Sequence, residues 1–222
     1  IASSNGSQEL KMQLRGYYIY TKSLPPSISD NQSQSNDAED ISIGTISQHL
    51  FSTLRGSTNL IFANSRAMTE LISAKLRLLC EKQNLPVEFW PHHGNLSRQL
   101  REDTESMLKD KSKPITAVCT STLEMGIDIG SVKSIAQIGT PLSVSSMRQR
   151  LGRSGRRGEP SIMRIYIQEI ENSSESQIQD SLRAELFQTI SMVNLLLNGW
   201  CESPSLEVYH FSTLIQQILS MI

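Results

Sequence analysis

Short apolar runs alternate with amphipathic segments through the middle of the chain. Five runs have the length and composition of buried strands: 59–63, 87–92, 115–119, 132–138 and 162–167. The segments between them carry apolar residues at helical spacing, at 66–83, 97–109 and 145–151. Strands that alternate with helices are typical of parallel crossover connections, in which helices cover both faces of one sheet. The pattern predicts an α/β fold built on a parallel sheet.

The first forty residues are patterned less clearly. Residues 14–21 are rich in tyrosine and favour a strand, whereas 27–40 are polar except for Ile28 and Ala38, which predicts a mobile loop or linker. A helix is expected over 41–54, where apolar residues recur every three or four positions. We therefore expect 1–40 to form an N-terminal strand and flexible linker ahead of the α/β domain.

The pattern changes again after Glu171, from where only helical spacing is found. A long helix is expected over 177–197 with a stop at Asn198-Gly199, and a second helix is expected over 212–222. These segments predict a helical extension over 172–222. The α/β domain is thus expected at 41–171.

Composition excludes several classes of protein. No apolar run approaches the roughly 18–20 residues that a membrane helix needs, and no basic segment with an apolar core opens the chain as a secretory signal. The three cysteines are widely spaced and give neither a disulfide framework nor a metal motif. We expect a cytoplasmic protein without membrane partners. Because the chain starts at Ile1, we also expect it to be part of a longer polypeptide.

Charge is unevenly distributed behind a net value of −1. Residues 165–222 hold seven acidic residues and one basic residue, a net charge of −6, so residues 1–164 carry +5. Within 147–164 there are six arginines and only one acid, Glu159. So dense a cluster in a nearly neutral chain indicates a local anion site.

Small, polar or cationic residues follow each predicted strand. Examples are Asn64-Ser65-Arg66 after the first strand and Thr120-Ser121 after the third. Ligands of open parallel sheets bind at the carboxyl ends of the strands, and backbone N–H groups at the helix starts there bind anions. Ordinary helix caps and turns have the same composition and remain the alternative for any one of these segments.

The segment Met147–Gly158 (MRQRLGRSGRRG) combines arginine with glycine in an unusual way. Two glycines, Gly152 and Gly155, fall inside an expected helix, where each costs roughly 1 kcal/mol. Close approach of the backbone to another backbone or to a phosphate would account for them. Arginine favours phosphate because its planar fork binds two oxygens at once and stays charged.

Four segments together resemble known helicase motifs. Gln149–Arg156 (QRLGRSGR) resembles motif VI of superfamily 2 helicases, and Thr120–Ile129 (TSTLEMGIDI) is similar to motif V. Leu60–Arg66 (LIFANSR) resembles motif IV, and His92–Arg101 (HHGNLSRQLR) resembles the segment that follows it. The ordered set covers about 59–168 and is similar to the second RecA-like domain, the C-terminal helicase domain, of DEAD/DEAH-box enzymes. The residues Glu124-Met125-Gly126 and the helical segments after Glu171 resemble the large helicase-related (Lhr-like) or Ski2-like branches. In those branches, Phe211–Ile222 would begin a winged-helix domain.

The resemblance implies roles at a nucleotide. Arg153 and Arg156 would reach the β- and γ-phosphates of ATP, with Arg156 as the arginine finger that stabilises the charge of phosphoryl transfer. Gln149 and Arg150 would organise the interface between domains, and Gly126 and Asp128 would lie near the nucleotide. A helix or turn cap is the alternative for Asp128.

The same resemblance implies a grip on single-stranded DNA or RNA. The residues that would contact its backbone are Asn64, Ser65, Arg66, Gly94, Arg98, Thr120 and Ser121. Backbone contacts carry no sequence preference, which suits a motor that steps along any strand. For Arg98 a solvated helix face is an equally good interpretation.

Two expected motifs of an ATPase are missing from the sequence. No glycine is followed by lysine, which excludes a Walker A loop, and no Asp-Glu dipeptide supplies a DExx box. The resemblance therefore implies that ATP and Mg²⁺ are bound mainly by a first RecA-like domain of the same polypeptide, and that this piece alone is inactive. The competing hypotheses are a non-catalytic nucleic-acid-binding or interaction module with this fold and, more remotely, a doubly wound small-molecule domain. A Walker A lysine upstream of Ile1 would favour the motor.

Overall fold

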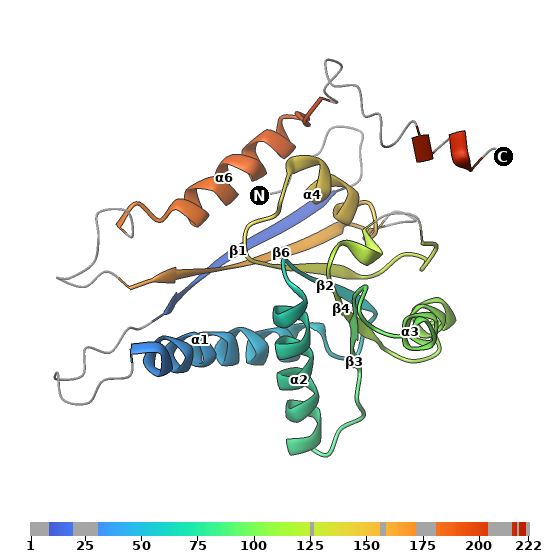
Figure 1. The fold of residues 1–222 in the computed structure, drawn as a ribbon, viewed down its shortest axis with the longest axis horizontal. Helices are drawn as coiled ribbons and strands as arrows, with labels where there is room; N and C mark the ends of the chain where they lie inside the picture. Colours follow the sequence, from blue (N-terminus) through green and yellow to red (C-terminus); the bar gives the residue numbers. More distant parts are fainter. Residues whose placement is uncertain are drawn as a thin grey trace.

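A computed structural model gives the fold of the chain. It describes residues 9–19, 31–124, 127–155, 159–171, 181–203, 215–216 and 218–220, with only the backbone described for 31–40. In this part of the chain, six strands form one sheet in the order β1-β6-β5-β2-β4-β3, and every neighbouring pair is parallel (Figure 1). The strands are β1 (Leu10–Ile19), β2 (Asn59–Ala63), β3 (Phe89–His92), β4 (Thr116–Cys119), β5 (Ser134–Ile138) and β6 (Ser161–Ile170). The predicted α/β fold is confirmed.

Helices cover both faces of this sheet. They are α1 (Asn31–Leu54), α2 (Arg66–Lys82), α3 (Arg98–Asp110), α4 (Val144–Leu151) and α6 (Ala184–Leu197), with a short 3₁₀ turn at Ser121–Leu123. Alternate residues of each strand face opposite sides. Ile61 of β2 therefore packs with α1 and α2, whereas Phe62 packs in the cluster that holds Leu108 of α3. Figure 1 shows α1 and α2 on one side of the sheet and α4 and α6 on the other.

Strand β1 belongs to the same sheet as the rest of the domain. It pairs with β6 along its whole length, from Leu10 with Ser161 to Ile19 with Ile170. Its Leu10, Met12 and Leu14 pack against the cluster beneath α4 and α6. Alternation of these residues with polar ones is typical of a half-buried strand, yet only 14–21 had been expected to be extended. The strand therefore starts earlier than expected and is an edge of the α/β domain rather than a separate element.

Helix α1 corrects the expected linker. The structure begins this helix at Asn31, so the prediction of a loop over 27–40 is wrong from that residue onward. The second half of α1 is held by the buried residues Ile43, Ile46 and Leu50. The first turn of a helix is costly to form, but each residue added to an existing helix gains one backbone hydrogen bond. The buried half of α1 therefore allows the polar turns before it to be helical.

The C-terminal part packs onto the domain. Helix α6 places Met192, Val193 and Leu196 against α4, β6 and β1. It ends as predicted, with Asn198 as C-cap and Gly199 at φ +74°. The single helix expected over 177–197 is wrong, because the left-handed backbone of Arg183 (φ +48°) interrupts it and α6 begins at Ala184. Residues 172–180 lie outside the described residues, as does most of the expected winged-helix start at 211–222. No helix in the described part of the chain is long and apolar enough to span a membrane.

Candidate functional site

The segments that follow strands β2 to β5 lie at one edge of the sheet. Because all six strands are parallel, Asn64, His93, Thr120 and Gly139, which follow β2, β3, β4 and β5, lie at the carboxyl edge. A cavity of about 260 Å³ opens there and is lined by residues that include Asn64, Ser65, Gly139 and Glu185. Burial and the neighbouring Glu169 raise the pKa of Glu185. The segments after β2, β3, β4 and β5 thus share one edge, whereas the arginine segment after α4 lies beside the start of β5.

Two of the three residues after β2 make contacts within the domain. The Asn64 Nδ2 group donates to the Thr140 carbonyl at 2.8 Å, and its Oδ1 accepts from Gln137 Nε2 at 3.2 Å. Ser65 is the N-cap of α2 and accepts from the Met68 amide at 3.1 Å. Arg66 is exposed on the first turn of α2. The geometry therefore presents Arg66 outward while it fixes the side chains of Asn64 and Ser65.

The other expected nucleic-acid contacts lie mostly on the surface. Gly94, Arg98 and Ser121 are exposed, and Thr120 is half-buried. The Arg98 side chain is 85% exposed and its Nε donates to Glu102 Oε1 at 2.6 Å, one helical turn away. Arg98 thus has both a solvated ion pair and access to a ligand.

Two buried histidines, the last residue of β3 and the next one, make side-chain contacts at the same edge. His92 Nδ1 lies 2.8 Å from Thr122 Oγ1 and its Nε2 lies 3.1 Å from Glu105 Oε1. Burial lowers the pKa of His92 in spite of Glu105, which acts in the opposite direction. His93 Nε2 lies 2.5 Å from Glu70 Oε1. Within the described residues, no three His, Cys, Asp or Glu side chains gather as a metal site would require.

Arg150 is the largest fully buried side chain described, at 1% exposure. Its Nε and Nη2 donate to Glu124 Oε2 at 3.0 and 2.8 Å, and its Nη1 donates to Gln137 Oε1. The guanidinium carbon also lies 4.6 Å from the centre of the Phe62 ring. All three guanidinium nitrogens are therefore engaged inside the domain, whereas the sequence had suggested the interface with another domain.

Arg153 is tied to the segment that resembles motif V. Its Nε and Nη2 donate to the Glu124 carbonyl at 3.2 and 3.0 Å, and its Nη1 donates to the Ile127 carbonyl at 2.7 Å. Glu124 thus binds Arg150 with its carboxylate and Arg153 with its carbonyl. The segments that resemble motifs V and VI form one connected unit.

The glycines near Arg153 have a different explanation from the one expected. Helix α4 ends at Leu151, so neither glycine lies inside a helix. Gly152 is the C-cap, and Gly155 adopts φ +74°, which is unfavourable for residues with a Cβ. The two glycines therefore end the helix and turn the chain.

The remaining predicted residues near the nucleotide are only partly described. Gln149 is exposed on α4. Asp128 is exposed as well, and its Oδ1 accepts from the Gly130 amide at 3.2 Å. This contact caps a turn, which was the alternative to a place near the nucleotide. Gly126 and Arg156 lie outside the described residues.

Sequence reasoning missed the two residues that hold this edge together, Glu124 and Gln137. Glu124 was part of the motif V resemblance but received no role. Gln137 is a polar residue in the apolar run VKSIAQI, and it is fully buried in β5. A buried side-chain amide requires partners, which is the signal that was available.

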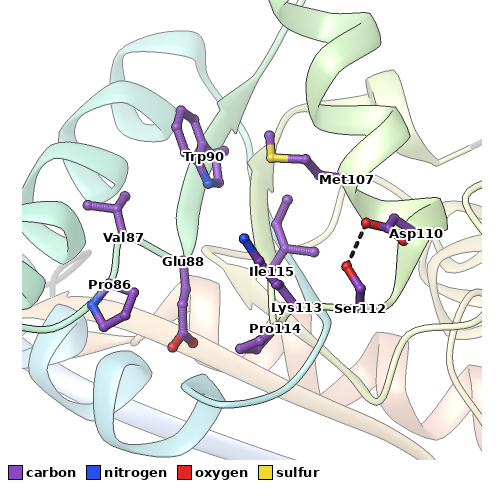
Figure 2. A pocket seen from close by; sticks show the side chains of 10 residues that line it. All are labelled: Pro86, Val87, Glu88, Trp90, Met107, Asp110, Ser112, Lys113, Pro114 and Ile115. Carbon is purple, nitrogen blue, oxygen red and sulfur yellow. Dashed lines mark hydrogen bonds between the residues drawn. The ribbon is translucent and has the colours of Figure 1, made fainter.

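A larger cavity lies at the opposite edge of the sheet. Its volume is about 550 Å³, and Figure 2 shows Trp90, Met107 and Ile115 around it at the amino-terminal side of β3 and β4. Glu88 lines this cavity and accepts from the Gly56 amide at 2.8 Å. None of the residues singled out in the sequence lines it.

The six-stranded parallel sheet with helices on both faces defines a RecA-like α/β domain. The model of the helicase conserved C-terminal domain matches residues 42–158, and the chain belongs to this family. It is 36% identical over 119 residues to the ATP-dependent helicase Lhr-Core of Sulfolobus acidocaldarius, which is 53% of this chain and 14% of that protein. It is 38% identical over 117 residues to Lhr-Core of Methanocaldococcus jannaschii, which is 50% of this chain and 13% of that protein.

Solved structures agree on the fold. The helicase Lhr of Mycobacterium smegmatis bound to ssDNA and AMP-PNP matches with a TM-score of 0.60 at 23% identity, over 89% of this chain and 23% of that chain. The C-terminal domain of the DEAD-box protein Dbp5 matches with a TM-score of 0.55 at 14% identity, over 83% of this chain and 84% of that chain. The expected C-terminal helicase domain of a superfamily 2, Lhr-like helicase is confirmed. The chain spans only about a seventh of the Lhr-Core relatives.

Proposed function

We propose that this chain is the second motor lobe of an ATP-dependent DNA or RNA helicase. The observation that carries the proposal is the series of side-chain contacts that links its helicase-like segments. Asn64 reaches Gln137, Gln137 reaches Arg150, and Glu124 joins Arg150 to Arg153. The Lhr-Core relatives are ATP-dependent helicases by name, which supports the same activity for the full-length protein.

In this proposal, Arg156 is the arginine finger and Arg153 supports it. Phosphoryl transfer spreads negative charge over the equatorial oxygens, and a guanidinium placed there stabilises that charge. Arg153 has five N–H groups, and its three hydrogen bonds to the Glu124 and Ile127 carbonyls use three of them. Contact with a phosphate would use the remaining two, or follow a rearrangement when two lobes close.

The first RecA-like domain of the same polypeptide would bind Mg²⁺ and most of the ATP. Magnesium in such sites is bound by one or two carboxylates together with phosphate oxygens and waters, and the sequence of this chain holds neither a Walker A loop nor a DExx box to assemble such a site. Exposed Gln149 and Asp128 would face the nucleotide from this lobe. Without its partner domain, this piece is expected to hydrolyse no ATP.

The nucleic-acid grip would be formed at the same edge. Arg66, Gly94, Arg98 and Ser121 are exposed there, with Asn64, Ser65 and Thr120 beside them. The proposed contacts are to phosphates and sugars, so DNA and RNA both fit. One Lhr neighbour is bound to ssDNA. Arg66→Ala should reduce the salt dependence of binding by about one phosphate contact.

Substitution of the two arginines in the full-length enzyme tests the proposal. Arg156→Ala should lower nucleic-acid-stimulated ATPase by about 10³-fold or more, because an arginine finger is worth about 10³–10⁵ in rate in GTPases. Arg153→Ala should lower it less. The matched control is Arg148→Ala, which removes an exposed arginine from the same segment and should stay within a few-fold of wild type. An Arg156→Ala enzyme that keeps its activity within a few-fold would refute the assignment and favour a non-catalytic binding module.

A further inference from the structure

A path of hydrogen bonds leads from the carboxyl edge of the sheet to the segment after α4. It starts at the Thr140 carbonyl, which accepts from Asn64, and continues from Asn64 Oδ1 to Gln137 Nε2 at 3.2 Å. Gln137 Oε1 accepts from Arg150, Arg150 donates to the Glu124 carboxylate at 2.8 Å, and the Glu124 carbonyl accepts from Arg153 at 3.0 Å. The path joins the proposed nucleic-acid side of the site to its proposed phosphate side.

Gln137 is the residue of this path for which neither the sequence nor the proposed function supplies a role. It is fully buried in β5, next to the central strand β2. Its Nε2 faces three acceptors, namely Asn64 Oδ1 and the carbonyls of Ile138 and Gly139 at 2.9 and 3.2 Å. Every polar atom of its amide is therefore engaged.

The chemistry of Arg150 fixes the direction of the path. A guanidinium can only donate, so the oxygen of Gln137 must face Arg150 and its nitrogen must face Asn64. In turn, Asn64 must present its own oxygen to Gln137 and its nitrogen to the Thr140 carbonyl. The buried amide of Gln137 thus sets the orientation of both Asn64 and Arg150.

We infer that Gln137 is a positioning residue that couples nucleic-acid binding at Asn64 to the placement of Arg150 and Arg153. The inference rests on the proposed function. A ligand that moves Asn64 changes the acceptor facing Gln137, and the buried amide passes that change to Arg150 and Glu124, whose carbonyl holds Arg153. Buried hydrogen bonds of one network depend on one another, so a change at one bond alters the next.

The coupling is measurable as a ratio of affinities. In the full-length enzyme, the dissociation constant of a fluorescent 20-nucleotide single strand is measured with and without a non-hydrolysable ATP analogue. Allosteric coupling between two ligands typically changes affinity by about 5–150-fold. We expect a ratio in this range for the wild type and a ratio below about two for Gln137→Met, which has similar length but no hydrogen-bonding amide.

A second buried amide supplies the matched control. Asn59 lies at the opposite end of β2, is fully buried, and bonds the Leu54 carbonyl, Thr116 and Ser134. Asn59→Leu should lower thermal stability as Gln137→Met does, but it should keep the wild-type affinity ratio. Asn64→Leu combined with Gln137→Met should have a ratio no lower than Gln137→Met alone, since both act on one path.

The outcomes separate the coupling role from the proposed function. A Gln137→Met enzyme whose ratio stays within two-fold of wild type overturns the coupling role alone. Equal loss of the ratio in Asn59→Leu also overturns it, because the effect is then one of general stability. A wild-type enzyme with no ATPase activity and no effect of the analogue refutes the motor function and the coupling together.

Discussion

Arg150 carries a permanent charge inside the domain, where water cannot solvate it. Glu124 compensates the charge, Gln137 takes a further N–H, and the Phe62 ring covers one face. A buried ion pair is costly to form, but it is far more costly to break on one side only. At the scale of single residues, this pair is therefore the most sensitive point of the site.

Removal of one partner of this pair should destabilise the chain strongly. Arg150→Met leaves Glu124 and the Gln137 oxygen without their donor, and we expect a loss of about 3–5 kcal/mol in the free energy of unfolding. The double variant Arg150→Met/Glu124→Leu should recover most of this loss, since it removes both charges. Urea denaturation followed by circular dichroism measures both. A single variant within about 1 kcal/mol of wild type would show that the ion pair contributes little.

At the scale of elements, the turn between β5 and α4 sets the geometry of the edge. Gly139 adopts φ +74°, and a Cβ at this position would lie 3.0 Å from Asn64 Nδ2. Its amide also donates to the Tyr166 carbonyl of β6 at 2.8 Å. The turn therefore needs glycine for its backbone conformation and for the close approach of Asn64.

Gly139→Ala should act on both stability and binding. The left-handed backbone costs an L-residue about 1–2 kcal/mol, and displacement of Asn64 should weaken the affinity of the full-length enzyme for a single-stranded oligonucleotide. Gly199→Ala is the matched control, because Gly199 has the same φ of +74° but nothing within 4 Å of its Cβ position. It should lose comparable stability and bind normally. Equal binding by the two variants would exclude a role for the Asn64 contact.

At the scale of the whole molecule, β1 is the edge strand on one side of the sheet. This strand is the only described neighbour of β6 on its outer edge, and it pairs with β6 through ten residues, whereas β5 pairs with β6 through four. Its inward side chains complete the cluster beneath α6. The α/β domain thus depends on residues that the sequence placed outside it.

A pair of neighbouring substitutions on β1 tests this dependence. Met12→Asp places a charge against the cluster under α4 and α6 and should cost about 1–3 kcal/mol or more in the free energy of unfolding. Gln13→Asp adds the same single negative charge on the exposed side of the strand and should stay within about 0.5 kcal/mol. Thermal unfolding of this chain measures both. Similar effects of the two variants would contradict the placement of β1 in the sheet.

Much of the fold was predictable because it depends on local patterns. Strands β2 to β6 and the helices between them follow from their short apolar runs and from helical periodicity. The errors lie where local signals are weak. The polar first turns of α1 form a helix because the rest of that helix is packed on the domain. Strand β1 is only half-buried, so the contrast between apolar and polar positions along it is small.

The site was predictable in its location but only partly in its contacts. The residues after the strands were expected at one edge, since parallel topology brings carboxyl ends together. The burial of Arg150 and the roles of Glu124 and Gln137 were not foreseen, because side-chain contacts between residues 13 and 26 positions apart depend on how α4 packs on the sheet.

The sequence alone determined the alternation of strands and helices, the helicase motifs and the concentration of arginine in one segment. These properties are fixed by residue identity and spacing. Only the tertiary structure decided which arginines are buried, what the glycines after α4 do, and that β1 joins the sheet. Those outcomes depend on which side chains from distant segments come to share one low-dielectric interior, where every charge and every amide must find a partner.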